Sequence, residues 1–173
     1  MSKTTLTFIM LFILLVPAQA VIFNNLILFS VALPLVFIYL IIRLPITLSP
    51  NWAMTVGFLT GLAVDIFSDT PGMNALACTI LAVCRRPVFH LYMSLDDDLS
   101  GQCPSIRTMG PAAYTKYMLT MVFIYCLCVF TIEAFQFFNF RLLVLRTVCS
   151  TLFTFILIYA VDSLSFRRRE KKL

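Results

Sequence analysis

Charged side chains inside apolar runs are the residues of this sequence most able to do chemistry. Asp65, Glu133 and Arg146 lie in three different hydrophobic runs. An unpaired ion in hydrocarbon is costly, so such groups face a bundle interior, pair with one another, or mark a binding or transport site. Their positions along the expected helices give them a similar depth, near the outer surface. We therefore expect one polar cluster of these three side chains, assisted by Asn74 or Gln136.

A second charged group is expected at the inner end of the helices. Arg85 and Arg86 interrupt an apolar run, and Asp162 reaches the same depth from the last run. Arginine is tolerated near an interface, where its long side chain reaches water. We expect Asp162 to meet Arg85 or Arg86. Residues 87–95 would then lie along the cytoplasmic surface. The plain structural interpretation of both charged groups is that they hold helices in register.

Patterns for catalysis or metal binding are weak. The sequence has no Ser/His/Asp set, no HExxH and no phosphate-cradling glycine loop, and His90 is its single histidine. None of the six cysteines forms a CxxC, and five lie in apolar runs where Cys packs as a small hydrophobe. Asp96, Asp97 and Asp98 indicate a solvated loop, because three consecutive side chains do not converge on one cation. We expect no enzyme, no metal and no cofactor.

The elements that must position these charges are membrane helices. Of the 173 residues, 61% are hydrophobic and 12% charged, whereas soluble domains are about 45–50% apolar and about 25% charged. The chain is therefore expected to be a single all-α domain, a polytopic membrane helix bundle over 1–173. Its apolar runs predict about six transmembrane helices, near 4–23, 26–42, 51–67, 71–90, 113–137 and 142–164. A cytoplasmic loop is expected over 94–112 and a basic tail over 165–173.

The distribution of basic residues predicts the orientation. With the N-terminus inside, the outer side holds Arg141 alone, and the inner side holds the other loop and terminal cations. These are Lys3, Arg43, Arg107, Lys116 and the tail. The positive-inside rule thus predicts that both termini are cytoplasmic, and the tail suits anionic lipid heads better than nucleic acid. Residues 1–20 also resemble a secretory signal, but the apolar pattern continues beyond them and favours a retained helix.

A small-residue face precedes the first buried acid. Gly57, Gly61 and Asp65 are spaced four apart and so share one face of a helix. A GxxxG pair allows close helix approach in lipid. Two interpretations stay open: packing among the protein's own helices, or docking of another protein's helix.

Two stretches carry a family resemblance. "GLAVDIFSDTPGMNALA" at 61–77 and "LAVCRRPVFHLY" at 81–92, together with the length, the spans and the tail, resemble the bacterial rod shape-determining MreD family. The resemblance implies a fold similar to the substrate-binding subunits of energy-coupling-factor transporters. It implies no catalytic activity. The family motif falls on Gly61, Asp65, Phe67, Pro71 and Gly72, which with Gly57 form the hypothetical partner-binding face.

The resemblance also implies a place in the cell. It is that of an inner-membrane scaffold of the cell-elongation machinery, which helps couple the MreB filament to peptidoglycan synthesis through MreC. RodA with its transpeptidase would belong to the same complex. The alternative is a small-molecule transporter or the substrate-binding subunit of an uptake system, with the outer polar cluster lining a ligand pocket.

Overall fold

The computed structural model describes residues 3–19, 33–68, 70, 72–93, 103–134 and 140–170, and this part of the chain is helical without strands. The expected all-α class is confirmed. The elements run in chain order as α1 (Lys3–Ala18), η2 (Val36–Ile38), α2 (Tyr39–Ile42), α3 (Pro50–Ser68), α4 (Met73–Tyr92), α5 (Ile106–Met109), α6 (Pro111–Ala134) and α7 (Phe140–Glu170).

Three helices of the described chain are long and apolar enough to cross a membrane: Met73–Tyr92, Pro111–Ala134 and Arg141–Asp162. A 20-residue helix such as α4 is about 30 Å long, which matches the hydrocarbon thickness of a bilayer. The six spans expected from the sequence are not all present as such helices. The protein is thus a helical protein with three potential membrane spans.

The expected second span, 26–42, is not one continuous helix. Residues 33–35 are irregular, and helix begins only at Val36. Pro34 explains the break, because proline cannot donate a backbone hydrogen bond and disfavours helix in the residue before it. Residues 20–32 lie outside the described chain. The helical part is short, but it lies at the centre of the bundle: Phe37, Ile38 and Ile41 are fully buried.

Side chains of α1 and α7 satisfy the irregular backbone at residues 33–36. The amides of Leu33 and Leu35 donate to Ser150 Oγ and Thr154 Oγ1, at 3.0 and 3.1 Å. Gln19 bridges the break, because its amide group donates to Pro34 O at 2.8 Å and accepts from the amide of Val36 at 3.0 Å. Irregular backbone at membrane depth is tolerated only where protein groups replace water in this way.

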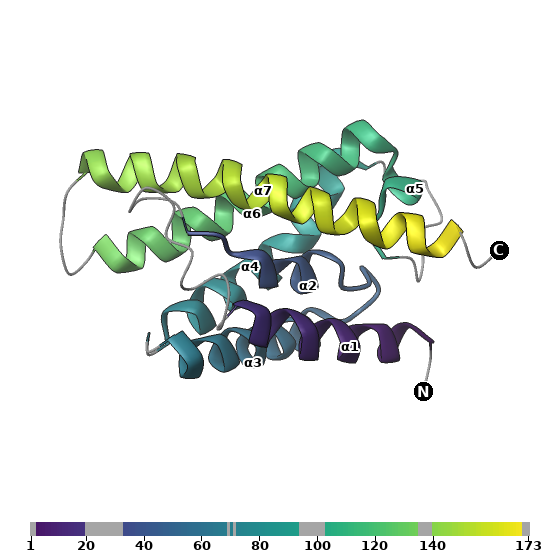
Figure 1. Cartoon of the computed structure of the whole chain (residues 1–173), viewed down its shortest axis with the longest axis horizontal. Helices are drawn as coiled ribbons and strands as arrows, with labels where there is room; N and C mark the ends of the chain where they lie inside the picture. Colours follow the sequence, from purple (N-terminus) through teal and green to yellow (C-terminus); the bar gives the residue numbers. More distant parts are fainter. Residues whose placement is uncertain are drawn as a thin grey trace.

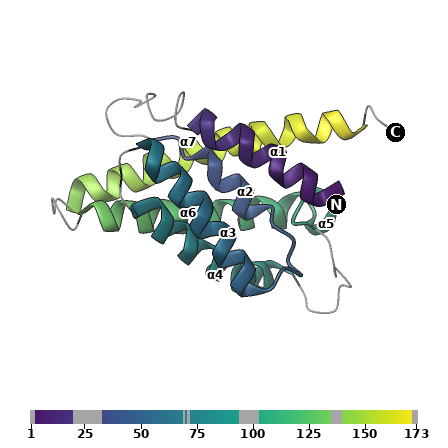
Figure 2. The same cartoon turned by 90° about the horizontal axis from the view of Figure 1, so that it is seen from below.

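The helices form a flattened bundle (Figures 1 and 2). α3, α4, α6 and α7 pack in succession, each against the next. In Figure 1, α7 runs along one side and α1 and α3 along the other, with α2 between them. The described chain starts, at α1, and ends, at α7, at the same end of the bundle in both views. The core between the layers is aromatic and sulfur-rich on the α6 side, where Tyr117, Met118, Met121 and Tyr125 are fully buried.

Candidate functional site

The α3–α4 hairpin contains the motif that the sequence singled out. Gly57 and Gly61 are buried against α4. A Cβ atom added to Gly61 would lie 2.6 Å from Ala75 Cα, and one added to Gly57 would lie 2.9 Å from the carbonyl oxygen of Cys78. Both glycines therefore allow the backbones of α3 and α4 to come into direct contact. Of the two interpretations left open above, internal packing is the one the structure has.

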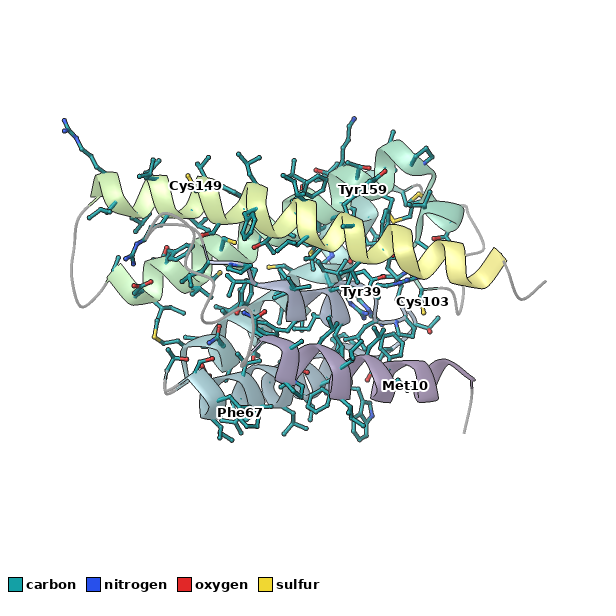
Figure 3. All side chains as sticks on the ribbon, viewed as in Figure 1. Met10, Tyr39, Phe67, Cys103, Cys149 and Tyr159 are labelled. Carbon is teal, nitrogen blue, oxygen red and sulfur yellow. The ribbon has the colours of Figure 1, made fainter. Side chains whose placement is uncertain are left out.

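The partner-binding hypothesis is corrected accordingly at three of its residues. Gly57, Gly61 and Asp65 are enclosed by α4 and offer no free surface. The exposed residues of that set are Phe67, which is 61% exposed at the edge of the bundle (Figure 3), and Gly72. Pro71 lies outside the described residues. The sequence could not decide this, since GxxxG predicts a close helix contact without naming the helix.

Asp65 caps the next helix. Its Oδ1 accepts hydrogen bonds from Thr70 Oγ1 at 2.9 Å and from the backbone and side-chain nitrogens of Asn74 at 3.0 and 2.9 Å. Its Oδ2 accepts one from the backbone nitrogen of Ala75 at 2.9 Å. These amides are among the first of α4, which begins at Met73. A carboxylate at a helix N-terminus satisfies free amides and interacts favourably with the helix dipole.

Asp65 takes the place of a local N-cap residue at the start of α4. The residue before α4, Gly72, has φ +81° and makes no side-chain capping bond. That left-handed conformation suits glycine and turns the chain so that the start of α4 points its amides at Asp65. Thr70 contributes differently, by donating to the carboxylate and accepting from Asn74 Nδ2 at 3.2 Å.

Asn74 extends the polar contact into α6. Its Oδ1 accepts a hydrogen bond of 2.6 Å from Tyr125, whose ring packs edge-on against Phe37 at 5.7 Å. Asp65, Asn74 and Tyr125 are 4%, 7% and 0% exposed. The motif therefore joins α3, α4 and α6 around a dry hydrogen-bond network. Such a network rigidifies a bundle when every member is satisfied.

The expected outer cluster is divided. Arg146 Nη1 lies 2.6 Å from Glu133 Oε1, which links α7 to α6. Both side chains are partly exposed, at 35% and 43%, and Asp65 is not part of this pair. The physical reason is that Asp65 already has its full set of donors from α4 and the turn before it. Gln136 lies outside the described residues, whereas Asn74 does assist Asp65.

The expected inner pairing is also different. Asp162 Oδ1 pairs with Arg43 Nη1 at 3.1 Å and accepts from the Tyr39 hydroxyl at 2.5 Å. Arg43 also donates to that hydroxyl at 2.7 Å. Asp162 is therefore not available to Arg85 or Arg86, which was the pairing expected from depth alone. The sequence did contain a signal for this contact, because Arg43 ends an apolar run at the depth expected for Asp162.

The two arginines of α4 behave differently from each other. Arg86 Nη2 donates to the carbonyl oxygen of Leu48 at 2.9 Å. Arg85 is fully buried, and no hydrogen-bond partner is found for its side chain in the described chain. α4 continues without interruption to Tyr92, with Pro87 inside it. Residues 87–92 therefore extend the helix and do not lie flat on the surface as a separate segment.

Residues that could hold a metal do not converge within the ranges that the structure covers. No group of three His, Cys, Asp or Glu side chains comes together there. His90 is exposed on α4, and Asp96, Asp97 and Asp98 lie outside those ranges. The described chemistry is thus one of internal capping and ion pairing.

Comparison with protein-family models, with curated proteins and with solved structures gave no match for this chain. The class of the protein is therefore stated from its structure. The part of the chain that the structure describes is all-helical, with three apolar helices that could span a membrane. Asp65, Asn74 and Asp162 are buried polar groups that join its helices.

Proposed function

We propose that this protein is a non-catalytic, multi-pass scaffold of the bacterial inner membrane that acts in cell elongation. The observation that carries the proposal is the engagement of Asp65 by α4. Asp65 is the acid of the motif best suited to chemistry. Its oxygens instead accept hydrogen bonds from α4, which hold α3 and α4 together as a hairpin. A carboxylate whose oxygens accept bonds from two backbone amides and two side chains is a structural element and a poor proton carrier.

The hairpin leaves an apolar stripe for a partner. Exposed residues follow one another along α3 at helical spacing: Trp52, Phe58, Leu59, Leu62 and Ile66. Together with Phe67 they form what we call the α3 stripe. A single-span partner helix could lie along it, because the hairpin beneath is fixed by the glycine contacts and by the Asp65 cap. The family resemblance names MreC as that partner, with MreB and RodA and its transpeptidase in the same complex.

The same proposal includes the finer architecture. Six crossings with both termini in the cytoplasm agree with the basic residues of the inner loops and tail. The described ends of the chain lie at one end of the bundle, as an even number of crossings requires. A fold similar to the substrate-binding subunits of energy-coupling-factor transporters is part of the proposal, and so is contact of the tail with anionic lipid.

Site-specific photo-crosslinking in cells tests the partner. A photoreactive residue placed at Phe58, Leu62 or Ile66 should capture MreC, because these positions share the α3 stripe. Positions Leu152 and Ile156, which are exposed on α7, are the matched controls and should give little or none. If MreC were crosslinked only by the photoreactive residues on α7, the α3 stripe would not be its binding surface. Rod-shaped cells that keep their shape after depletion of the protein would remove the elongation role.

A different measurement distinguishes a transporter from a scaffold. A transporter or substrate-binding subunit should retain a small molecule on purification or rescue uptake of one. The scaffold should do neither, and its loss should round the cells.

A further inference from the structure

Arg85 is the one buried ionic group that the described structure leaves uncompensated. Its side chain is 0% exposed, and Nε, Nη1 and Nη2 all lack a hydrogen-bond partner. A buried, unpaired ion costs several kcal/mol even after local relaxation. Arginine keeps its proton in proteins, so Arg85 cannot escape that cost by becoming neutral. A counter-charge is therefore the physical solution for this group.

Among the described residues, no carboxylate is found beside Arg85. Its described titratable neighbours are Tyr117 on α6, Arg86 and Cys103. The acid at this end of the bundle, Asp162, is held by Arg43 and Tyr39. Among the described residues of this region, the three arginines Arg43, Arg85 and Arg86 thus outnumber the single carboxylate, that of Asp162. The excess charge favours an anion from outside the chain.

Arg86 adds a second incomplete donor and ties the site to the connection between α2 and α3. Its Nε is also buried without a partner, while its Nη2 holds the carbonyl of Leu48. Leu48 belongs to the connection between α2 and α3, which contains Thr47 and Ser49 and ends at Pro50. Arg86 is therefore tied to this connection, and Arg85 directly precedes Arg86 in α4.

We propose that Arg85, with Arg86 beside it, binds a phosphate-type anion at the inner membrane surface, namely the phosphodiester of an anionic lipid or soluble phosphate. The planar guanidinium fork fits phosphate oxygens in a bidentate manner. The three unpartnered nitrogens of Arg85 offer donors to an anion with several acceptor oxygens. This binding does not depend on the scaffold role proposed above.

The test uses the full-length protein, delipidated in a neutral maltoside detergent. Its melting temperature is measured with added phosphatidylglycerol, with phosphatidylcholine and with inorganic phosphate, and native mass spectrometry counts retained lipid. Wild-type protein should melt several degrees higher with phosphatidylglycerol and unchanged with phosphatidylcholine. Arg85→Met should lose that shift. Lys116→Met is the matched control, since Lys116 is an exposed cation near the inner start of α6, and it should keep the shift.

The three additives distinguish between the two sources of the anion, a lipid headgroup and free phosphate. A shift with phosphatidylglycerol alone assigns the site to lipid, and an equal shift with inorganic phosphate assigns it to the phosphate group by itself. No shift with either, as expected if a protein carboxylate neutralises Arg85, overturns the proposal. So does an undiminished shift in Arg85→Met. Should that variant not fold, Arg85→Lys decides: it keeps the charge but loses the fork, and lipid retention should fall at least tenfold.

Discussion

Asp65 shows how a carboxylate can persist inside an apolar helix. Its two oxygens accept four hydrogen bonds from Thr70, Asn74 and Ala75. Hydrogen bonds to a charged group contribute about 1.5–3 kcal/mol each, more than those between neutral groups. The burial of the charge is thereby offset within nine or ten residues of the same chain. The residue is a structural cap, and its removal should act on stability first.

Asp65→Asn should destabilise the protein by about 2–4 kcal/mol, since the amide carries no charge and turns a donor toward the backbone amides of α4. The free energy of unfolding can be measured in mixed micelles of a mild detergent and dodecyl sulfate. Thr55→Val is the control on the same helix: Thr55 is exposed and bonds only to Asn51 O within its own helix. Equal stability of the two variants would show that the cap is not important.

At the scale of elements, the two glycines of α3 set the distance to α4. The space over Gly61 is filled by the backbone of Asn74 and Ala75, and the space over Gly57 by Cys78 O and by the Ala82 methyl group. Backbone atoms cannot rotate out of the way as a side chain can. The helices must therefore separate to admit a methyl group, and the Asp65 cap must open with them.

Gly61→Ala should thus be more harmful than Gly57→Ala. Overpacking a tight contact costs about 1–3 kcal/mol and sometimes more, so we expect about 3 kcal/mol for Gly61→Ala and about 1 kcal/mol for Gly57→Ala. Thermal melting in detergent measures the order. Gly110→Ala serves as a comparison without a clash, because nothing lies within 4 Å of its added Cβ and only its φ of +77° opposes the change. A reversed order for the two α3 variants would contradict the close contact at Gly61.

For the whole molecule, the charged residues divide into two groups. Arg43 pairs with Asp162, and Arg86 bonds to Leu48 in the connection that follows Arg43. Glu133 and Arg146 lie toward the α6–α7 connection. The basic excess in the first group is the arrangement that the positive-inside rule associates with the cytoplasm.

Cysteine labelling in intact cells checks this orientation. In a background where Cys84, Cys103, Cys128 and Cys149 are replaced by alanine, Thr47→Cys and Lys116→Cys should resist a membrane-impermeant maleimide, because the proposed orientation places both positions on the cytoplasmic side. Arg141→Cys, exposed at the start of α7, should react. Permeabilised cells provide the control, in which all three positions label. Labelling of Lys116→Cys in intact cells would reverse the orientation.

Several features could be predicted from the residues because they depend on composition and local spacing. High hydropathy gave the helical class, and the i, i+4 spacing of Gly57 and Gly61 predicted a close helix contact. Depth along a helix also placed Glu133 near Arg146. The irregular segment at 33–35 was missed, although Pro34 was a signal, because its partners Gln19, Ser150 and Thr154 are far away in the sequence.

By itself, the sequence determined that this chain is strongly apolar, that it forms helices, and that the few charges inside those helices need partners. Only the tertiary structure decided which group compensates which: Asp65 with the start of α4, Asp162 with Arg43, and nothing described with Arg85. The physical reason is that periodicity and depth constrain a side chain along and around its own helix. The neighbour it meets depends on how the helices are arranged around one another.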